Sequence, residues 1–425
     1  MSRRSFFRRG IISLLLLALT GAGCTKGPDA ATLAAAQPKS LTIWGVVDDY
    51  DKYAPVLDAY QREYSNVRID FRRFRLEDYE NALLEAFAED RGPDIFLIHN
   101  DWTTKYQSKI TPMPAQVQVA AQVVVGSVKK DVVWQMQTVN MPTRGEFKNA
   151  HADAVTRDAV RMIAGPGENG VLQERIMGVP IFMDTLALYY NKDLLNRAGI
   201  ATPPTTWGEF QDQVKRLTRL NPRGGIDQSG AAIGLGSNVE RSTDIITALI
   251  TQNGGDMASP DGRVLFQSVP INANLNDPPS YEALRFYTDF ANSAKDTYTW
   301  NAEQPNSLEA FMAGKTAFFF GYAYQRDLIR AQAPKLNLGI TALPQIDPGN
   351  PKNVANYWLW VVAKKSKEPQ QAWHLLSYMM QPQKTKQILD LMKRPSARKS
   401  FLAEQLRDDD IGVFAVASGS AIRAE

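Results

Sequence analysis

The chain has 425 residues, 44% of them hydrophobic, and its length predicts two globular domains. Lysine and arginine total 48 against 45 aspartates and glutamates, and because four arginines lie in the first 23 residues, the rest of the chain carries a formal charge of 3 − 4 = −1. Nucleic-acid phosphates are bound by clustered positive charge, so this balance excludes a typical nucleic-acid-binding protein.

The first 23 residues have the order of a secretory signal. Basic residues precede an apolar run at 11–19, about half of the ~20 residues that span a bilayer, and small residues follow before Cys24. Cys24 is the only cysteine, which excludes a disulfide within the chain. The stretch resembles a lipoprotein signal, which implies a signal peptide at 1–23, a lipid on Cys24 and a lipidated tether at 24–40. The alternative is an ordinary cleaved signal with an incidental thiol. Residues 2–8 also resemble a twin-arginine motif, so the export route stays open.

Strand and helix patterns alternate after the tether. Short apolar runs predict strands at 41–47, 67–71 and 94–98, and apolar residues at helical spacing predict helices at 53–64 and 79–87. This β-α-β-α-β order is typical of a parallel sheet with helices on both faces, so the predicted fold class is α/β. In such sheets ligands bind at the carboxyl ends of the strands.

The remaining chain repeats these patterns less regularly. The predicted helices are 154–163, 206–218, 245–252, 281–290, 308–312, 370–380 and 385–392, and the predicted strands are 181–190, 316–321, 338–343 and 358–363. A glycine-containing stretch at 165–170 has the spacing of a dinucleotide-binding loop, but it follows a helical pattern and predicts an ordinary loop. The three histidines are far apart, so we expect no metal, no cofactor and no local catalytic motif.

Several segments together resemble family 1 extracellular solute-binding proteins, the sugar-binding components of ABC importers that are similar to maltose-binding protein. These segments are 41–45 (LTIWG), 92–96 (GPDIF), 178–180 (GVP), 184–194 (DTLALYYNKDL), 203–207 (PPTTW) and 310–317 (AFMAGKTA). The resemblance covers roughly residues 40 to 420 and implies a periplasmic-binding-protein fold, in which two α/β lobes close around a ligand cleft by hinge motion.

The same resemblance implies the extent of each lobe. Lobe one would contain 40–183 and 343–381, and lobe two would contain 186–338 and 382–425, with crossings near Asp184 and near 338–344. Members of the family continue with further helices after the region that corresponds to 395–421, which implies a second lobe that is shortened at its C-terminal end.

Carboxylates after predicted strands are the first candidates for ligand contacts, because carboxylates accept hydrogen bonds from sugar hydroxyls. Asp49 follows the first strand, although one of Asp48 and Asp49 is expected to be a helix N-cap. Asp101 and Trp102 follow the third strand. Asp184 lies inside an apolar run, where a lone carboxylate is costly, and the alternative to ligand contact there is an interior cap or salt bridge.

Aromatic rings that can cover the apolar faces of a sugar are the second group of candidates. Tyr322 and Tyr324 follow the predicted strand that ends at 321, where alternate residues share a face. Trp300 lies in another candidate segment, and at most one of Tyr357 and Trp358 can face the ligand. Arg241 precedes a predicted helix, and a surface role is equally open to it.

These features predict a solute-binding protein on the outer face of the cytoplasmic membrane that hands a small neutral sugar to the permease subunits of an ABC importer. No basic cluster lies near the candidate acids in the sequence, which disfavours an anionic ligand. A secreted carbohydrate-active enzyme, an envelope sensor and a polyamine ligand stay as alternatives.

Overall fold

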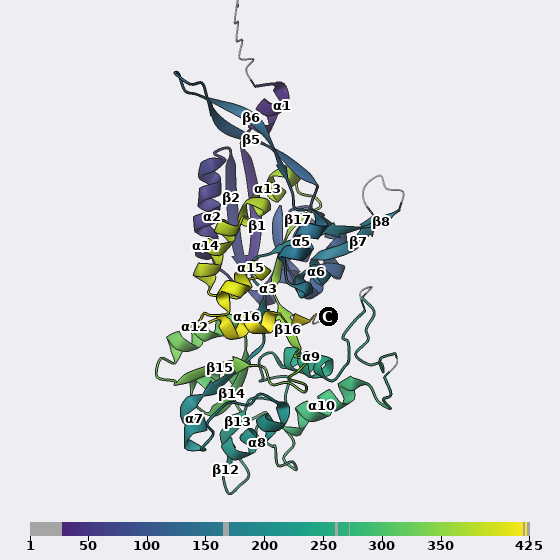
Figure 1. The fold of residues 1–425 in the computed structure, drawn as a ribbon, viewed down its shortest axis with the longest axis vertical. Coiled ribbons are helices and arrows are strands. Elements are labelled where there is room, and N and C mark those ends of the chain that lie inside the picture. Colours follow the sequence, from purple (N-terminus) through teal and green to yellow (C-terminus); the bar gives the residue numbers. More distant parts are fainter. Residues whose placement is uncertain (1–27, 165–169, 260–261, 272, 420, 423–425) are drawn as a thin grey trace, which may run out of the picture.

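The computed structural model describes residues 28–164, 170–259, 262–271, 273–419 and 421–422. Within these residues the chain forms two α/β lobes that follow one another along the longest axis of the molecule (Figure 1). The leader, Cys24, the first residues of the tether and residues 165–169 of the glycine-containing loop lie outside the described residues. Among the helices that are described, none is both long and apolar enough to cross a bilayer.

The first lobe is built on a mixed sheet with the strand order β2-β1-β3-β17-β4, in which β9 also pairs with β17. β1 runs parallel to β2 and β3, whereas β17 is antiparallel to β3. The strands are β1 (Lys39–Val46), β2 (Val67–Phe74), β3 (Ile95–His99), β4 (Ile110–Thr111), β9 (Val179–Pro180) and β17 (Trp358–Ala363). The apolar runs of β3 and β17 are buried because helices cover the sheet.

Amphipathic helices enclose this sheet. In α2 (Tyr50–Glu63), Tyr53, Val56, Leu57 and Tyr60 recur at helical spacing and are buried in the core, as the sequence pattern predicts. Further helices that contribute core residues to this lobe include α3 (Leu76–Ala88), α5 (Arg144–Ala150), α6 (Asp153–Ala159), α13 (Pro369–Met379) and α14 (Pro382–Met392). Between β3 and β4 lie the short helices η1 (Asn100–Trp102), α4 (Thr103–Tyr106) and η2 (Gln107–Lys109).

Two β-hairpins extend the first lobe. One consists of β5 (Gln116–Val125) and β6 (Asp131–Asn140), against which the short helix α1 (Ala30–Ala35) lies. The other consists of β7 (Val160–Ala164) and β8 (Leu172–Ile176). The helix predicted at 154–163 therefore ends at Ala159, because the last residues of that pattern pair with β8 as a strand.

The second lobe has a sheet with the order β12-β13-β14-β11-β15. Its strands are β11 (Ala187–Asn191), β12 (Arg219–Leu220), β13 (Ile226–Ala231), β14 (Thr316–Gly321) and β15 (Leu338–Ala342). Around it lie α7 (Lys192–Arg197), α8 (Trp207–Leu217), α9 (Ser242–Gln252), α10 (Pro279–Asp289), α11 (Ser307–Met312) and α12 (Ala323–Gln332). Phe414 of α16 (Gly412–Ser418), which follows α15 (Lys399–Gln405), also packs into this lobe.

The chain passes between the lobes through short paired strands. β10 (Asp184–Thr185) is antiparallel to β16 (Asn353–Asn356), which also pairs with β18 (Ala421–Ile422). Met183 packs in the first core and Leu186 in the second, so one crossing lies at the segment expected near Asp184.

The other expected boundaries differ from the packing in the structure. Leu343 and Val354 belong to the second core and Ala355 to the first, so this crossing lies about ten residues later than 344. Ile388 and Ala397 also belong to the first core. The segment expected in lobe two from 382 therefore enters that lobe only after 397. α14 stays in the first lobe because its apolar face packs against α2.

Candidate functional site

A cavity of about 410 Å³ lies between the two lobes. Five of the candidate residues line it: Trp102, Asp184, Arg241, Tyr324 and Trp358. Further lining comes from residues that the sequence did not single out: Val47, Leu76, His99, Phe182, Asp244, Asn356 and Arg394. The cavity therefore combines apolar rings with acidic and basic groups from both lobes, which is the usual composition of a site for a small polar molecule.

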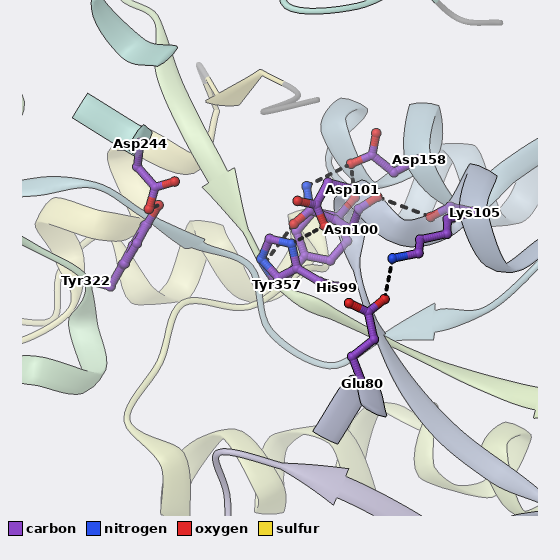
Figure 2. A network of polar contacts seen from close by, with 10 residues as sticks. Glu80, His99, Asn100, Asp101, Lys105, Asp158, Asp244, Tyr322 and Tyr357 are labelled. Carbon is purple, nitrogen blue, oxygen red and sulfur yellow. Dashed lines mark hydrogen bonds and ion pairs between the residues drawn. The ribbon is translucent and has the colours of Figure 1, made fainter. Parts of the chain in front are cut away.

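Two tryptophans form the aromatic wall of the first lobe. The rings of Trp102 and Trp358 meet edge to face, with centroids 5.6 Å apart and an angle of 78°. Trp358 begins β17 opposite His99, the last residue of β3, so the strand pairing brings both tryptophans to the same edge of the sheet. Tyr357 points the other way and is buried against Asp158 (Figure 2), as expected for neighbours on a strand.

His99 links this aromatic wall to a carboxylate. Its Nδ1 lies 2.5 Å from Oδ1 of Asp101 (Figure 2). Its ring contacts Trp358 edge to face, with the ring centroids 5.3 Å apart. Asp101 itself does not belong to the cavity lining. It instead orients the imidazole that does, which is a contact the sequence did not predict.

On the second lobe, the start of α9 presents a compensated pair of charges. Arg241 precedes the helix in the left-handed conformation (φ 60°), and Asp244 lies in the first turn. Nη2 of Arg241 donates to the Tyr324 hydroxyl at 2.5 Å, and the guanidinium lies over the ring of Tyr322 at 5.2 Å. Burial raises the pKa of the Asp244 carboxyl, and the positive charge of Arg241 opposes that rise.

Asp184 lies at the crossing between the lobes, where it lines the cavity and also accepts hydrogen bonds from the start of α12. Its two oxygens accept the backbone N–H of Ala323 at 2.9 and 3.1 Å, at the first turn of α12, and one of them accepts the N–H of Thr185 at 2.9 Å. Only 2% of the residue is exposed. Burial raises its pKa to about 6, against the lowering effect of these backbone donors and of Arg394. Within the protein, Asp184 thus acts as an interior cap, which is one of the alternatives to ligand contact that the sequence left open.

Arg394 is the main cavity residue that sequence reasoning missed. Its Nη1 and Nη2 donate to the two carboxylate oxygens of Asp48 at 3.1 and 2.9 Å, and both side chains are buried. The guanidinium lies over Phe182 at 4.5 Å and over Tyr324 at 5.7 Å. Asp48 and Arg394 are 346 residues apart, so no local pattern joins them. The fold thus places a second arginine in the lining beside the candidate Arg241, although no basic cluster lies near the candidate acids in the sequence.

Besides Asp101, three more of the candidate residues lie outside the cavity lining. Asp49 precedes α2 at the surface and pairs with Arg73 at 3.0 Å, while its neighbour Asp48 turns inward. Trp300 is fully buried in the second core, where its indole N–H donates to Oδ1 of Asn238 at 2.9 Å. A polar partner in the interior therefore satisfies this tryptophan.

Tyr322 is the third of these residues, and it contacts a residue of the cavity lining without belonging to the lining itself. The strand ends at Gly321, and Tyr322 is the N-cap of α12, so it does not share a strand face with Tyr324. Its ring is buried in the second core, and its hydroxyl donates to Asp244 at 3.0 Å (Figure 2). Tyr322 thus positions a carboxylate that lines the cavity.

Within the described part of the chain, no group of histidine, cysteine or acidic side chains is arranged to hold a metal ion. The residues that line the cavity provide hydrogen-bond donors, acceptors and ring faces for a ligand.

Comparison with known sequences finds relatives that are named as binding proteins. The chain is 24% identical over 215 residues to a probable ABC transporter-binding protein of Deinococcus radiodurans, covering 50% of this chain and 49% of the relative. It is 28% identical over 214 residues to a maltodextrin-binding protein of Bacillus subtilis, covering 48% and 46%. These alignments span about half the length of the relatives.

Solved structures share the fold over most of the chain. The acarbose-binding receptor of Streptomyces glaucescens superposes with a TM-score of 0.65 at 16% identity, covering 91% of this chain and 87% of the receptor. A cyclo/maltodextrin-binding protein that holds maltotetraose gives a TM-score of 0.65 at 15% identity, covering 91% and 87%. Residues 45–386 match the family described as bacterial extracellular solute-binding protein, and the chain therefore belongs to this family.

Proposed function

We propose that the protein is the extracytoplasmic solute-binding component of an ABC importer, which binds a small neutral saccharide in the cavity between its lobes and delivers it to the permease. The observation that carries this proposal is the pair of tryptophans, Trp102 and Trp358, beside charged groups that are already compensated within the protein. Ring faces cover the apolar C–H surfaces of a sugar, and polar groups beside them reach its hydroxyls.

The charge balance of the cavity supports an uncharged ligand. Arg394 is paired with Asp48, and Arg241 lies beside Asp244, which accepts from Tyr322. A polyamine would have to compete with two arginines for the acidic groups, and an anion would have to compete with the carboxylates for the arginines. A neutral polyhydroxylated molecule can use the free lone pairs and N–H groups without disturbing either pair.

The relatives point to the same class of ligand. The names of several relatives and neighbours mention maltodextrin, diacetylchitobiose, maltotetraose or mannobiose. These compounds are neutral or nearly neutral saccharides of two or more units. The cavity of about 410 Å³ suits a ligand of one to a few sugar units.

Calorimetry with the purified protein tests the ligand class. Maltotetraose, mannobiose, diacetylchitobiose and spermidine would be titrated separately at low and at high salt. We expect at least one saccharide to bind with an affinity that salt changes little, because no net charge is screened. Binding of spermidine that fades with salt, together with no response to any saccharide, would contradict the proposal.

We also propose that Cys24 carries the lipid that holds the protein at the outer face of the cytoplasmic membrane. The support is the position of the sole cysteine directly after a short apolar leader. Cys24→Ser should move the protein from the membrane fraction to the soluble fraction. A variant that fractionates like the wild type would show that the anchor is elsewhere or absent.

A further inference from the structure

The hairpin of β5 and β6 forms a long ribbon at the end of the first lobe that is farthest from the second lobe (Figure 1). Each strand has ten residues, which corresponds to a length of about 34 Å. At the base of the ribbon, Val117 and Val119 are buried in the core of the first lobe. The other end of the ribbon, residues 124–132, is called here the ribbon tip.

The ribbon tip exposes apolar side chains that no described part of the chain covers. Val124 and Val132 pair directly across the two strands and are 63% and 62% exposed, and Val128 in the turn is 98% exposed. Trp134 lies two residues after Val132, and therefore on the same face of the ribbon. Protruding ribbons in soluble proteins are ordinarily protected by polar or charged residues, so a valine cluster at the tip indicates a surface that meets something apolar.

The charges at the tip favour an anionic surface. Lys129, with 88% of its side chain exposed, and the exposed Lys130 lie in the turn beside Val128. Asp131 lies 3.8 Å from Lys129, so the tip keeps one net positive charge. Valines that can enter the headgroup region, next to lysines that can contact anionic headgroups, are the arrangement expected of a bilayer contact.

The start of the chain lies at the same end of the molecule as the ribbon. α1 lies against β5 and β6, and its N-cap is Asp29, whose carboxylate accepts the N–H of Thr32 at 2.8 Å. Asp29 follows Cys24 by five residues, which span at most about 18 Å when fully extended. A lipid on Cys24 would therefore keep this end of the molecule close to the bilayer.

We propose that the ribbon tip is a second membrane contact, which inserts Val124, Val128 and Val132 into the headgroup region of an anionic bilayer. This inference rests on the lipid anchor proposed above. A lipid on a short tether fixes the distance of the protein from the membrane but leaves its orientation free, and two separate attachments restrict that orientation. The protein would then present its cleft at a defined height and angle to the importer.

The first experiment measures the depth of the tip in the bilayer. In the lipidated protein the thiol of Cys24 is consumed, so Val128→Cys supplies the sole free thiol for a polarity-sensitive fluorophore. The protein is reconstituted in vesicles of phosphatidylethanolamine and phosphatidylglycerol that contain a spin-labelled quencher lipid. Leu172→Cys is the matched control, because Leu172 is 56% exposed on the other hairpin of the same lobe.

We expect the quencher lipid to reduce the fluorescence at position 128 several-fold more than at position 172. Equal quenching at the two positions would overturn the proposal. Shielding of position 128 that arises only when the vesicles also hold the permease would overturn it as well, since the occupant would then be a protein.

The second experiment separates the ribbon from the lipid. The Cys24→Ser protein lacks the lipid, so only a weak association through the ribbon should remain, which is measurable with an excess of the same vesicles. The change of Val124, Val128 and Val132 to serine should lower this residual cosedimentation about tenfold, because apolar area no longer enters the bilayer. The control replaces Val171 and Leu172 by serine and should have no effect. Unchanged cosedimentation of the ribbon variant, or a concentration-dependent dimer that this variant abolishes, would refute the membrane contact.

Flotation of the wild-type protein and cosedimentation of the serine variants distinguish failure of the anchor proposal from failure of the ribbon proposal. If the wild-type protein does not float with vesicles, the anchor on Cys24 is wrong. The difference in cosedimentation between the two serine variants does not depend on that lipid, so it still decides whether the ribbon tip meets a bilayer.

Discussion

Replacement of Asp184 by asparagine tests whether this carboxylate is held in the structure against an unfavourable environment. The side chain is 2% exposed, and burial raises its pKa to about 6 from an ordinary 3.8. The backbone N–H groups of Ala323 and Thr185 offset only part of the cost of burying its charge.

The sign and size of the effect follow from that pKa. Between pH 3.8 and about 6 the native protein holds a proton on Asp184 that the unfolded chain has already lost. The contribution of Asp184 to the free energy of unfolding therefore falls as the pH rises through this window, by about 3 kcal/mol in total. Asparagine does not titrate, but it has one acceptor oxygen in place of two, which costs about 1 kcal/mol at every pH.

Urea unfolding of both proteins at pH 4 and pH 7, without ligand, measures this balance. We expect Asp184→Asn to be about 1 kcal/mol less stable than the wild type at pH 4 and about 1–2 kcal/mol more stable at pH 7. Asp49→Asn is the control, because it removes the same charge from a side chain that is 64% exposed and not buried. If Asp184→Asn differs from the wild type equally at both pH values, the reasoning about its burial is refuted.

Three other substitutions test the site. Trp102→Ala should lower saccharide affinity by about 1–2 kcal/mol, seen by calorimetry, because one ring face is lost; unchanged affinity would remove Trp102 from the site. Tyr322→Phe should weaken binding about fivefold through Asp244, with little change in the melting temperature. Arg394→Met should lower the free energy of unfolding by about 3 kcal/mol, because it leaves Asp48 buried without its partner. Adding Asp48→Asn to Arg394→Met should restore part of that loss, and a double variant as unstable as the single one would contradict the pairing.

The sequence predicts the first half of lobe one well because its signals are local. The helix of Tyr53, Val56 and Tyr60 and the strand that ends at His99 each carry their own periodicity, so no distant contact is needed to find them. The ribbon also has a local signal, the alternation of glutamine and valine that begins at Gln116.

The site is only partly predictable because its members meet through tertiary contacts. Trp102, Tyr324 and Trp358 follow strands or lie at strand starts, and the position of such residues in an α/β fold is informative. Arg394 has no such signal, since its partner Asp48 lies at the other end of the chain. Trp300 lies in a segment that was expected to face the cleft, but its indole N–H has a polar partner in the core, Asn238, which the sequence does not indicate.

The paired crossings between the lobes also determine how the molecule can move. β10 and β16 are joined side by side, with Asp184 opposite Asn356 and Thr185 opposite Ala355. A hydrogen-bonded ribbon bends readily across its face and resists shear in its plane, because shear would break its ladder. The lobes should therefore rotate mainly about one axis, which crosses this pair of strands. Asp184 lies in β10 and also accepts hydrogen bonds from the start of α12. Each rotation would therefore move this helix end, with Tyr324 beside it, along the same path toward the tryptophans.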